Sequence, residues 1–150
     1  MSFRITETMA GRHTAVDGGK DQPFAFEVTW GPRQLRDWAN PLSERFLWNE
    51  LAGRVRADGL FDWTPCTGSL SLDYARGRVV YTFDAEVAGR PVRFHGEKVN
   101  IRPWNLAFSH TTCFGTLVDL ESGRLLSRVV VSFRLRDLPR FAASLRWGRG

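Results

Sequence analysis

Lysine, cysteine and long apolar runs are all scarce in this chain of 150 residues. Lys20 and Lys98 are the only lysines, and the arginines that supply the rest of the net charge of +5 are scattered among acidic residues. Since no run of basic residues occurs, the sequence does not predict a nucleic-acid partner. The two cysteines, Cys66 and Cys113, show no Cys-x-x-Cys spacing and have no nearby histidine pair. We therefore expect free thiols and no metal site.

Features that would mark the chain as a membrane protein, a secreted protein or an enzyme of a known class are also missing. The uncharged apolar stretches are only a few residues long, as in residues 129–131, whereas a membrane helix needs about 20. The first residues contain no apolar core and no cleavage site, so we expect no signal peptide, no membrane span and a cytoplasmic protein. There is no Gly-x-Gly-x-x-Gly motif, no phosphate-binding loop and no recognisable pair of catalytic carboxylates. The sequence therefore predicts no cofactor and no catalytic residue.

What the chain does contain is alternation with a period of two, which is typical of half-buried strands. It is clearest in the middle of the chain and weaker in residues 3–8 and 50–57. The other predicted strands are residues 24–30, 68–74, 79–87, 92–98, 114–120 and 125–133. Tight turns are expected at residues 76–77, 89–90 and 122–123, where glycine supplies the positive φ that such turns require.

The central hairpin can be given a register. A two-residue turn at 89–90 places Phe83 opposite Gly96 and Asp84 opposite His95. One face of the pair is then apolar and the other pairs acids with bases, which favours this arrangement. A slip by one residue would exchange the two faces.

Helix signals are few. Residues 32–39 suit a short helix with a proline in the first turn. A final helix over residues 137–145 would be capped by Asp137 and would bury an apolar stripe. We therefore predict one domain over residues 1–150, an all-β antiparallel up-and-down barrel with a short helix after the second predicted strand and a C-terminal helix.

Candidate binding residues follow from the apolar face of these strands. With this register Tyr81 faces Lys98 on the inner face, where an unpaired ammonium is costly. Lys98 could anchor a ligand carboxylate or sterol hydroxyl, or it could lie at the rim and reach water. Trp63 and Trp104 lie in loop-like segments and could gate or plug a barrel mouth. The predicted ligand-binding set is Leu72, Tyr74, Tyr81, Phe83, Phe94 and Lys98, with Trp104 and His110 near one opening.

A resemblance covers most of the chain through short motifs. Thr6-Glu7-Thr8-Met9-Ala10-Gly11 opens it, a phenylalanine-rich strand and a short helix follow, and Gly96-Glu97-Lys98-Val99 ends the central hairpins. Trp104 and the pair Thr111-Thr112 come next. This order resembles a barrel domain found in bacteria beside cholesterol-oxidase-type flavoproteins of the glucose–methanol–choline oxidoreductase family. His110 departs from the pattern, because an acidic residue usually precedes the threonines there.

The resemblance implies a lipocalin-like barrel working near lipid or steroid metabolism, with an oxidoreductase as a possible partner. We accordingly expect a non-catalytic binding module for an apolar small molecule that is steroid-like or fatty-acid-like. Two alternatives stay open: an accessory domain of an oxidoreductase with a packed barrel, and a small barrel enzyme acting on a lipid-like substrate at the barrel mouth. The size of the internal cavity separates the binding module from the packed accessory domain, since side chains that fill the interior leave no room for a ligand.

Overall fold

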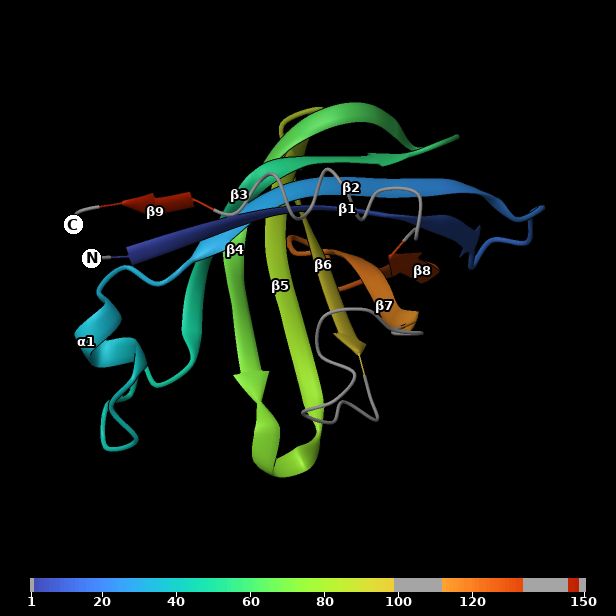
Figure 1. Ribbon diagram of the computed structural model, residues 1–150. Helices are drawn as coiled ribbons and strands as arrows, with labels where there is room; N and C mark the ends of the chain where they lie inside the picture. Colours follow the sequence, from blue (N-terminus) through green and yellow to red (C-terminus); the bar gives the residue numbers. More distant parts are fainter. Residues whose placement is uncertain (1, 99–111, 134–145, 149–150) are drawn as a thin grey trace.

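The computed structural model describes residues 2–98, 112–133 and 146–148, which form a closed barrel of eight antiparallel strands and one added strand (Figure 1). The barrel strands are β1 (Ser2–Ala15), β2 (Gln22–Gly31), β3 (Trp48–Ala57), β4 (Phe61–Asp73), β5 (Arg78–Val87), β6 (Arg90–Lys98), β7 (Thr112–Asp119) and β8 (Leu125–Phe133). The predicted all-β antiparallel barrel is confirmed. Trp63, expected in a loop, lies within β4 instead.

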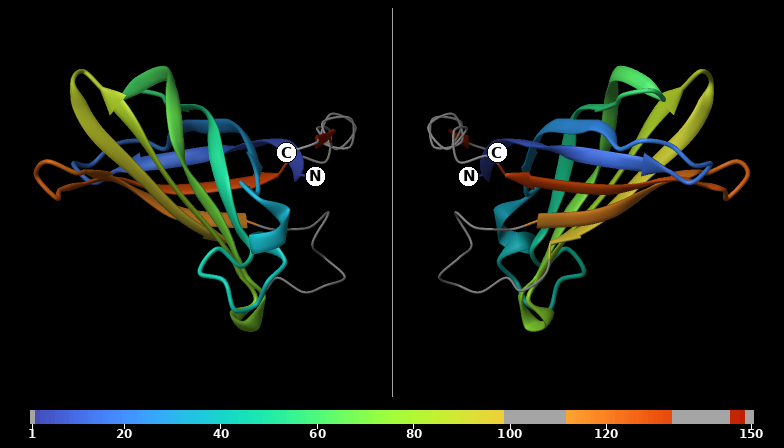
Figure 2. Two further views of the ribbon diagram at one scale, coloured as in Figure 1. Left: turned by 90° about the vertical axis from the view of Figure 1, so that its left-hand side faces the viewer. Right: turned by 90° about the vertical axis from the view of Figure 1, so that its right-hand side faces the viewer.

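Closure follows from the order of pairing. Each strand pairs with the next along the chain, and β8 returns to pair with β1. The short strand β9 (Arg146–Gly148) extends the sheet beside the first residues of β1. The side views in Figure 2 show β1 and β8 crossing the central strands β4 to β6 at a wide angle. Each strand of the barrel is therefore paired on both sides over much of its length, which leaves few open sheet edges.

Helix is confined to short turns in the described part of the chain. The connection after β2 contains a single α-helical turn, α1 (Leu35–Trp38), without a side-chain cap. A 3₁₀ turn, η1 (Tyr74–Arg76), joins β4 to β5. The predicted C-terminal helix over residues 137–145 lies outside the described residues. No helix among the described residues is long and apolar enough to cross a membrane.

The β5–β6 hairpin corrects the predicted register by two residues. Its turn consists of Ala88 and Gly89, which both adopt positive φ angles of 52° and 79°. Phe83 therefore lies opposite Phe94 rather than Gly96. The physical reason is the type I′ geometry, which requires positive φ at both central residues. Alanine rarely adopts a positive φ, so the sequence gives no sign of a turn at Ala88. A shift of two residues preserves the faces, so the predicted inner and outer residues of both strands are still on the expected sides.

The other two predicted turns have different outcomes. The β4–β5 loop is longer than two residues, because η1 and Gly77 separate the paired residues Asp73 and Arg78. Tyr74, predicted as the last inward residue of a strand, is therefore in the turn. The β7–β8 turn falls where predicted, with Gly123 at a φ of 69°.

The interior of the barrel is filled by apolar side chains from every barrel strand. At its centre five buried aromatic rings pack on one another. The ring centres of Phe83 and Phe94 are 4.8 Å apart, those of Phe26 and Phe83 are 5.2 Å apart, and those of Phe24 and Phe94 are 5.6 Å apart. Tyr81 joins this group with its centre 5.5 Å from that of Phe26. The packed rings occupy the middle of the barrel, so any interior site must lie toward one of its ends.

Two glycines explain how the strands bend around this core. A Cβ atom on Gly53 of β3 would lie 2.0 Å from the carbonyl oxygen of Glu27, and one on Gly68 of β4 would lie 2.0 Å from that of Thr82. Only glycine allows the neighbouring backbones to approach so closely.

Candidate functional site

A buried carboxylate organises the one charged cluster that the described residues place inside the barrel. Glu7 of β1 is 5% exposed and points inward. Its Oε1 accepts hydrogen bonds from the hydroxyl of Tyr81 and, at 3.2 Å, from the indole Nε1 of Trp30. Its Oε2 lies 3.7 Å from the ammonium of Lys98. The cluster therefore connects β1, β2, β5 and β6 across the interior.

Lys98 confirms the expectation of an inward lysine but corrects its partner. It is the last residue of β6, is 8% exposed and lies opposite Val79, not opposite Tyr81. Its Nζ is 5.1 Å from the centre of the Tyr81 ring, so it also makes a cation–π contact. The 3.7 Å separation from Glu7 is an ion-pair distance and too long for a hydrogen bond. Within the described part of the chain, the ammonium thus has charge partners but no hydrogen-bond acceptor.

The protonation of the neighbours follows from burial. Burial, together with the negative charge of Glu7, raises the pKa of Tyr81 well above its usual value. Burial also raises the pKa of Cys113 to about 12, against the opposing effect of the Lys98 charge. Both groups are consequently neutral at physiological pH, and Tyr81 acts as a hydrogen-bond donor to Glu7.

The structure brings together only part of the predicted site. Tyr81 and Lys98 belong to the charged cluster, and Leu72 packs partly buried against the core. Phe83 and Phe94 are fully buried in the ring stack and so contribute to the core. Tyr74 lies in η1. Trp104 and His110 fall outside the described residues.

Sequence reasoning missed Glu7, although a signal was present. Residues 5, 7, 9, 11 and 13 share one face of a strand, and that face carries Ile5 and Met9. A glutamate in that series is an inward carboxylate that needs a partner. Residues 3–8 alternate only weakly, so the sequence alone does not predict that Glu7 pairs with the inward Lys98.

His13 is another inward polar residue, and hydrogen bonds to its two ring nitrogens fix its imidazole in place. Its Nε2 is 2.8 Å from the carbonyl oxygen of Asp58 and its Nδ1 is 2.8 Å from the hydroxyl of Ser127. The imidazole is 2% exposed, and its ring lies edge-on to Phe24. Both ring nitrogens therefore have partners, as buried polar groups require.

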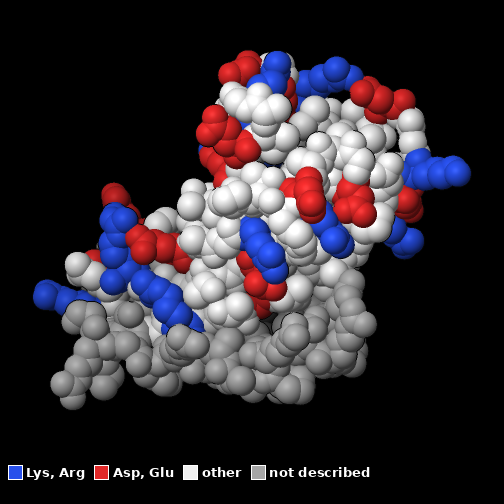
Figure 3. Space-filling model, turned by 90° about the horizontal axis from the view of Figure 1, so that it is seen from above, with Lys and Arg blue, Asp and Glu red and all other residues white. Residues whose placement is uncertain are grey.

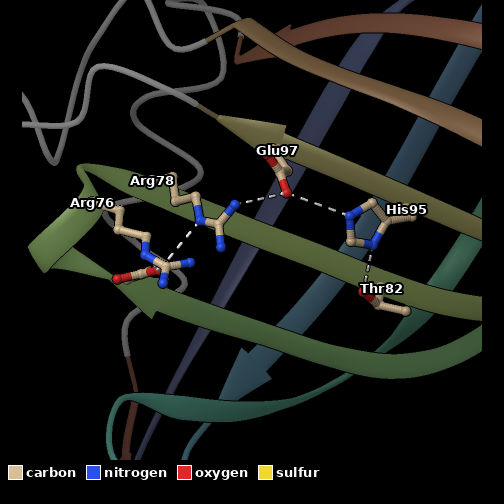
Figure 4. A network of polar contacts seen from close by, with 6 residues as sticks. Arg76, Arg78, Thr82, His95 and Glu97 are labelled. Carbon is tan, nitrogen blue, oxygen red and sulfur yellow. Dashed lines mark hydrogen bonds and ion pairs between the residues drawn. The ribbon is translucent and has the colours of Figure 1, made fainter.

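The remaining described histidine, His95, lies on the outer face (Figure 4). The predicted pairing with Asp84 is wrong, because the two-residue shift places His95 opposite Thr82. Its Nδ1 is 3.1 Å from the Thr82 hydroxyl and its Nε2 is 3.5 Å from Glu97, which Arg78 also contacts at 3.3 Å. The charged side chains of this network are 31–49% exposed, so it adds little stability.

Comparisons with family models, curated proteins and solved structures gave no match to this chain. The resemblance to the oxidoreductase-associated barrel domain therefore stays a prediction. Among the described residues, no group of three histidine, cysteine or acidic side chains is arranged to hold a metal ion. The assignment of a function rests on the geometry of the charged cluster.

Both cysteines are free and buried, which gives a direct chemical prediction. Burial raises the pKa of Cys66 and of Cys113 from 9.0 to about 12. We expect the native protein at pH 8 to react with a thiol reagent at least a hundredfold more slowly than the denatured protein, because the thiolate is the reactive form. Since the unfolded thiols lose protons first, the two groups also lower stability as the pH rises from 9 to 12. Rapid labelling of native protein would contradict the buried placement.

Proposed function

We propose that the barrel is a non-catalytic binding module for a small, largely apolar molecule with one oxygen acceptor, held at the end of the interior where Lys98 lies. The observation that carries this proposal is the Lys98 ammonium. Its side chain is 10% exposed and makes no hydrogen bond to a described residue, so its donors are available to a ligand oxygen that displaces water. Apolar walls with one or two polar groups are the usual form of a small-molecule site.

The charged cluster also narrows the chemistry of the ligand. Glu7 already offsets the charge of Lys98, so a ligand carboxylate would bring a second negative charge next to Glu7. A neutral hydroxyl or ketone oxygen can accept from Lys98 without that repulsion. Of the two predicted ligand classes, the geometry favours a steroid-like alcohol or ketone over a fatty acid.

The packed accessory domain remains the second candidate, and the ring stack favours it. Phe26, Phe83 and Phe94 fill the centre of the barrel, so a ligand has to fit beside them at one end. On this alternative Lys98 and Glu7 serve only to join strands, and the outer surface docks on an oxidoreductase. The lipocalin-like relationship, that partner and the cytoplasmic location are also proposals.

Two probes that have alkyl chains of the same length but different head groups test the proposed site. We expect 1-decanol to bind saturably in isothermal titration calorimetry and decanoate to bind more weakly. Replacing Lys98 with methionine keeps the bulk and removes the donor, so it should weaken 1-decanol binding by about 1.5–3 kcal/mol, the value of a hydrogen bond to a charged group.

The chain provides a matched control, because Lys20 is the only other lysine and is exposed in the β1–β2 loop. Lys20→Met should leave binding unchanged. Circular dichroism checks that Lys98→Met is folded. If neither probe binds the native protein, or if the folded Lys98→Met variant binds 1-decanol as well as the native protein does, the packed accessory domain is the better account.

A further inference from the structure

An open hollow lies on the outer face of the barrel, away from the charged cluster. It spans β1 to β4 and has a volume of about 560 Å³, within the range of about 300–1,000 Å³ usual for small-molecule sites. Its lining includes the small residues Ala52 and Gly68 of β3 and β4. Trp48 forms part of its wall, with its indole half-buried and the Arg45 guanidinium 5.5 Å from the centre of its ring.

Arg4 is held rigidly at this hollow. Its Nη1 donates to the carbonyl oxygens of Phe3 at 3.0 Å and Pro32 at 2.8 Å. The same nitrogen lies 2.6 Å from where a Cβ atom of residue 31 would be, so Gly31 makes room for the guanidinium. These carbonyls are neutral, and no carboxylate in the described part of the chain offsets the charge of Arg4. Its Nε and Nη2 donors likewise have no acceptor there.

The lack of a carboxylate partner sets Arg4 apart from many arginines on the described surface. Blue and red side chains interleave over the face shown in Figure 3, and many arginines are paired with a carboxylate. Within the hollow, Arg33 is paired in this way, with its Nε 2.5 Å from Glu50. Arg4 therefore leaves the hollow with one positive charge in excess, next to a second guanidinium and a planar indole.

We propose that this hollow binds a small anion that joins a planar ring to a phosphate or carboxylate. The anionic group accepts hydrogen bonds from Arg4, whose fixed guanidinium presents its free donors in one plane. The ring packs against Trp48, since aromatic faces bind planar ligands without selecting one ring. The site is independent of the interior ligand, because it lies outside the barrel and takes an anion instead of a neutral molecule.

Adenosine 5′-monophosphate is a suitable probe, because its ring and its phosphate can be removed separately. We expect it to bind in isothermal titration calorimetry, and adenosine and ribose 5-phosphate to bind at least tenfold more weakly. Indole-3-acetate as a second probe tells whether a carboxylate is preferred to a phosphate. Failure of both ring-bearing anions to bind would overturn the proposal.

Variants locate the binding. Arg4→Gln should weaken binding of adenosine 5′-monophosphate by about tenfold or more, and Arg4→Lys, which keeps the charge and loses the planar fork, should weaken it less. Trp48→Leu should reduce its affinity to that of ribose 5-phosphate. Arg93→Gln is the control, since Arg93 pairs with Asp84 on a different part of the outer face. Equal affinities for the native protein and a folded Arg4→Gln variant would place the binding elsewhere and refute the site.

Discussion

Replacing Glu7 with glutamine is expected to lower the free energy of unfolding by about 3–5 kcal/mol, the usual cost of removing one member of a buried ion pair. The substitution keeps the shape of the side chain but leaves Lys98 nearly buried with no negative charge beside it. Tyr81 and Trp30 would also donate to a neutral amide oxygen instead of a carboxylate. Urea denaturation followed by circular dichroism measures the change from the shift of the midpoint.

Two further variants separate the buried pair from an ordinary surface pair. Glu27→Gln removes a glutamate of β2 whose side chain is 41% exposed and 3.7 Å from Arg54, and should cost at most about 1 kcal/mol. Adding Lys98→Met to Glu7→Gln should recover much of the lost stability, since the double variant buries no charge. A cost for Glu7→Gln as small as that for Glu27→Gln would show that the cluster is open to water.

Strand positions and faces could be predicted from the sequence because alternation directly records burial. The inner residues Tyr81, Phe83 and Phe94 are buried as the period of two requires. The register could not be obtained in the same way. Two turns that differ by one position along the chain give hairpins with the same faces, and the choice between them depended on a positive φ at Ala88. Alanine gives no local sign of that conformation.

The candidate site was predictable only in part, because its central residue is distant in sequence from the others. Lys98 and Tyr81 lie on neighbouring strands, so local pairing was enough to bring them together. Glu7 meets them only because β8 returns to β1 and closes the barrel. No local pattern contains that closure.

The interior of the barrel has two regions: a ring stack stabilised by tight packing, and a charged cluster stabilised by pairing of opposite charges. The rings need tight packing, and polar groups meet them only at the edge of the stack: the Tyr81 hydroxyl donates to Glu7, the Lys98 ammonium lies over the Tyr81 ring, and the His13 imidazole lies edge-on to Phe24 in the described part of the chain. In the charged cluster, Lys98 is paired with Glu7 and has no hydrogen-bond acceptor among the described residues. A ligand site at the Lys98 end and a packed centre are therefore compatible, provided that the ligand does not require the rings to move.

Replacing Phe26 with alanine tests this division and is expected to cost about 3–5 kcal/mol, as for other buried aromatic side chains. Phe26 is 0% exposed, and its ring centre lies 5.2 Å from that of Phe83 and 5.5 Å from those of Tyr81 and Phe94. Phe114→Ala, at a residue on the outer face of β7 that is 56% exposed, is the control and should change stability by no more than about 1 kcal/mol. Chemical denaturation of both variants gives the comparison. A cost for Phe26→Ala below about 1 kcal/mol would mean that the ring borders open space, and the ligand site would then extend into the centre of the barrel.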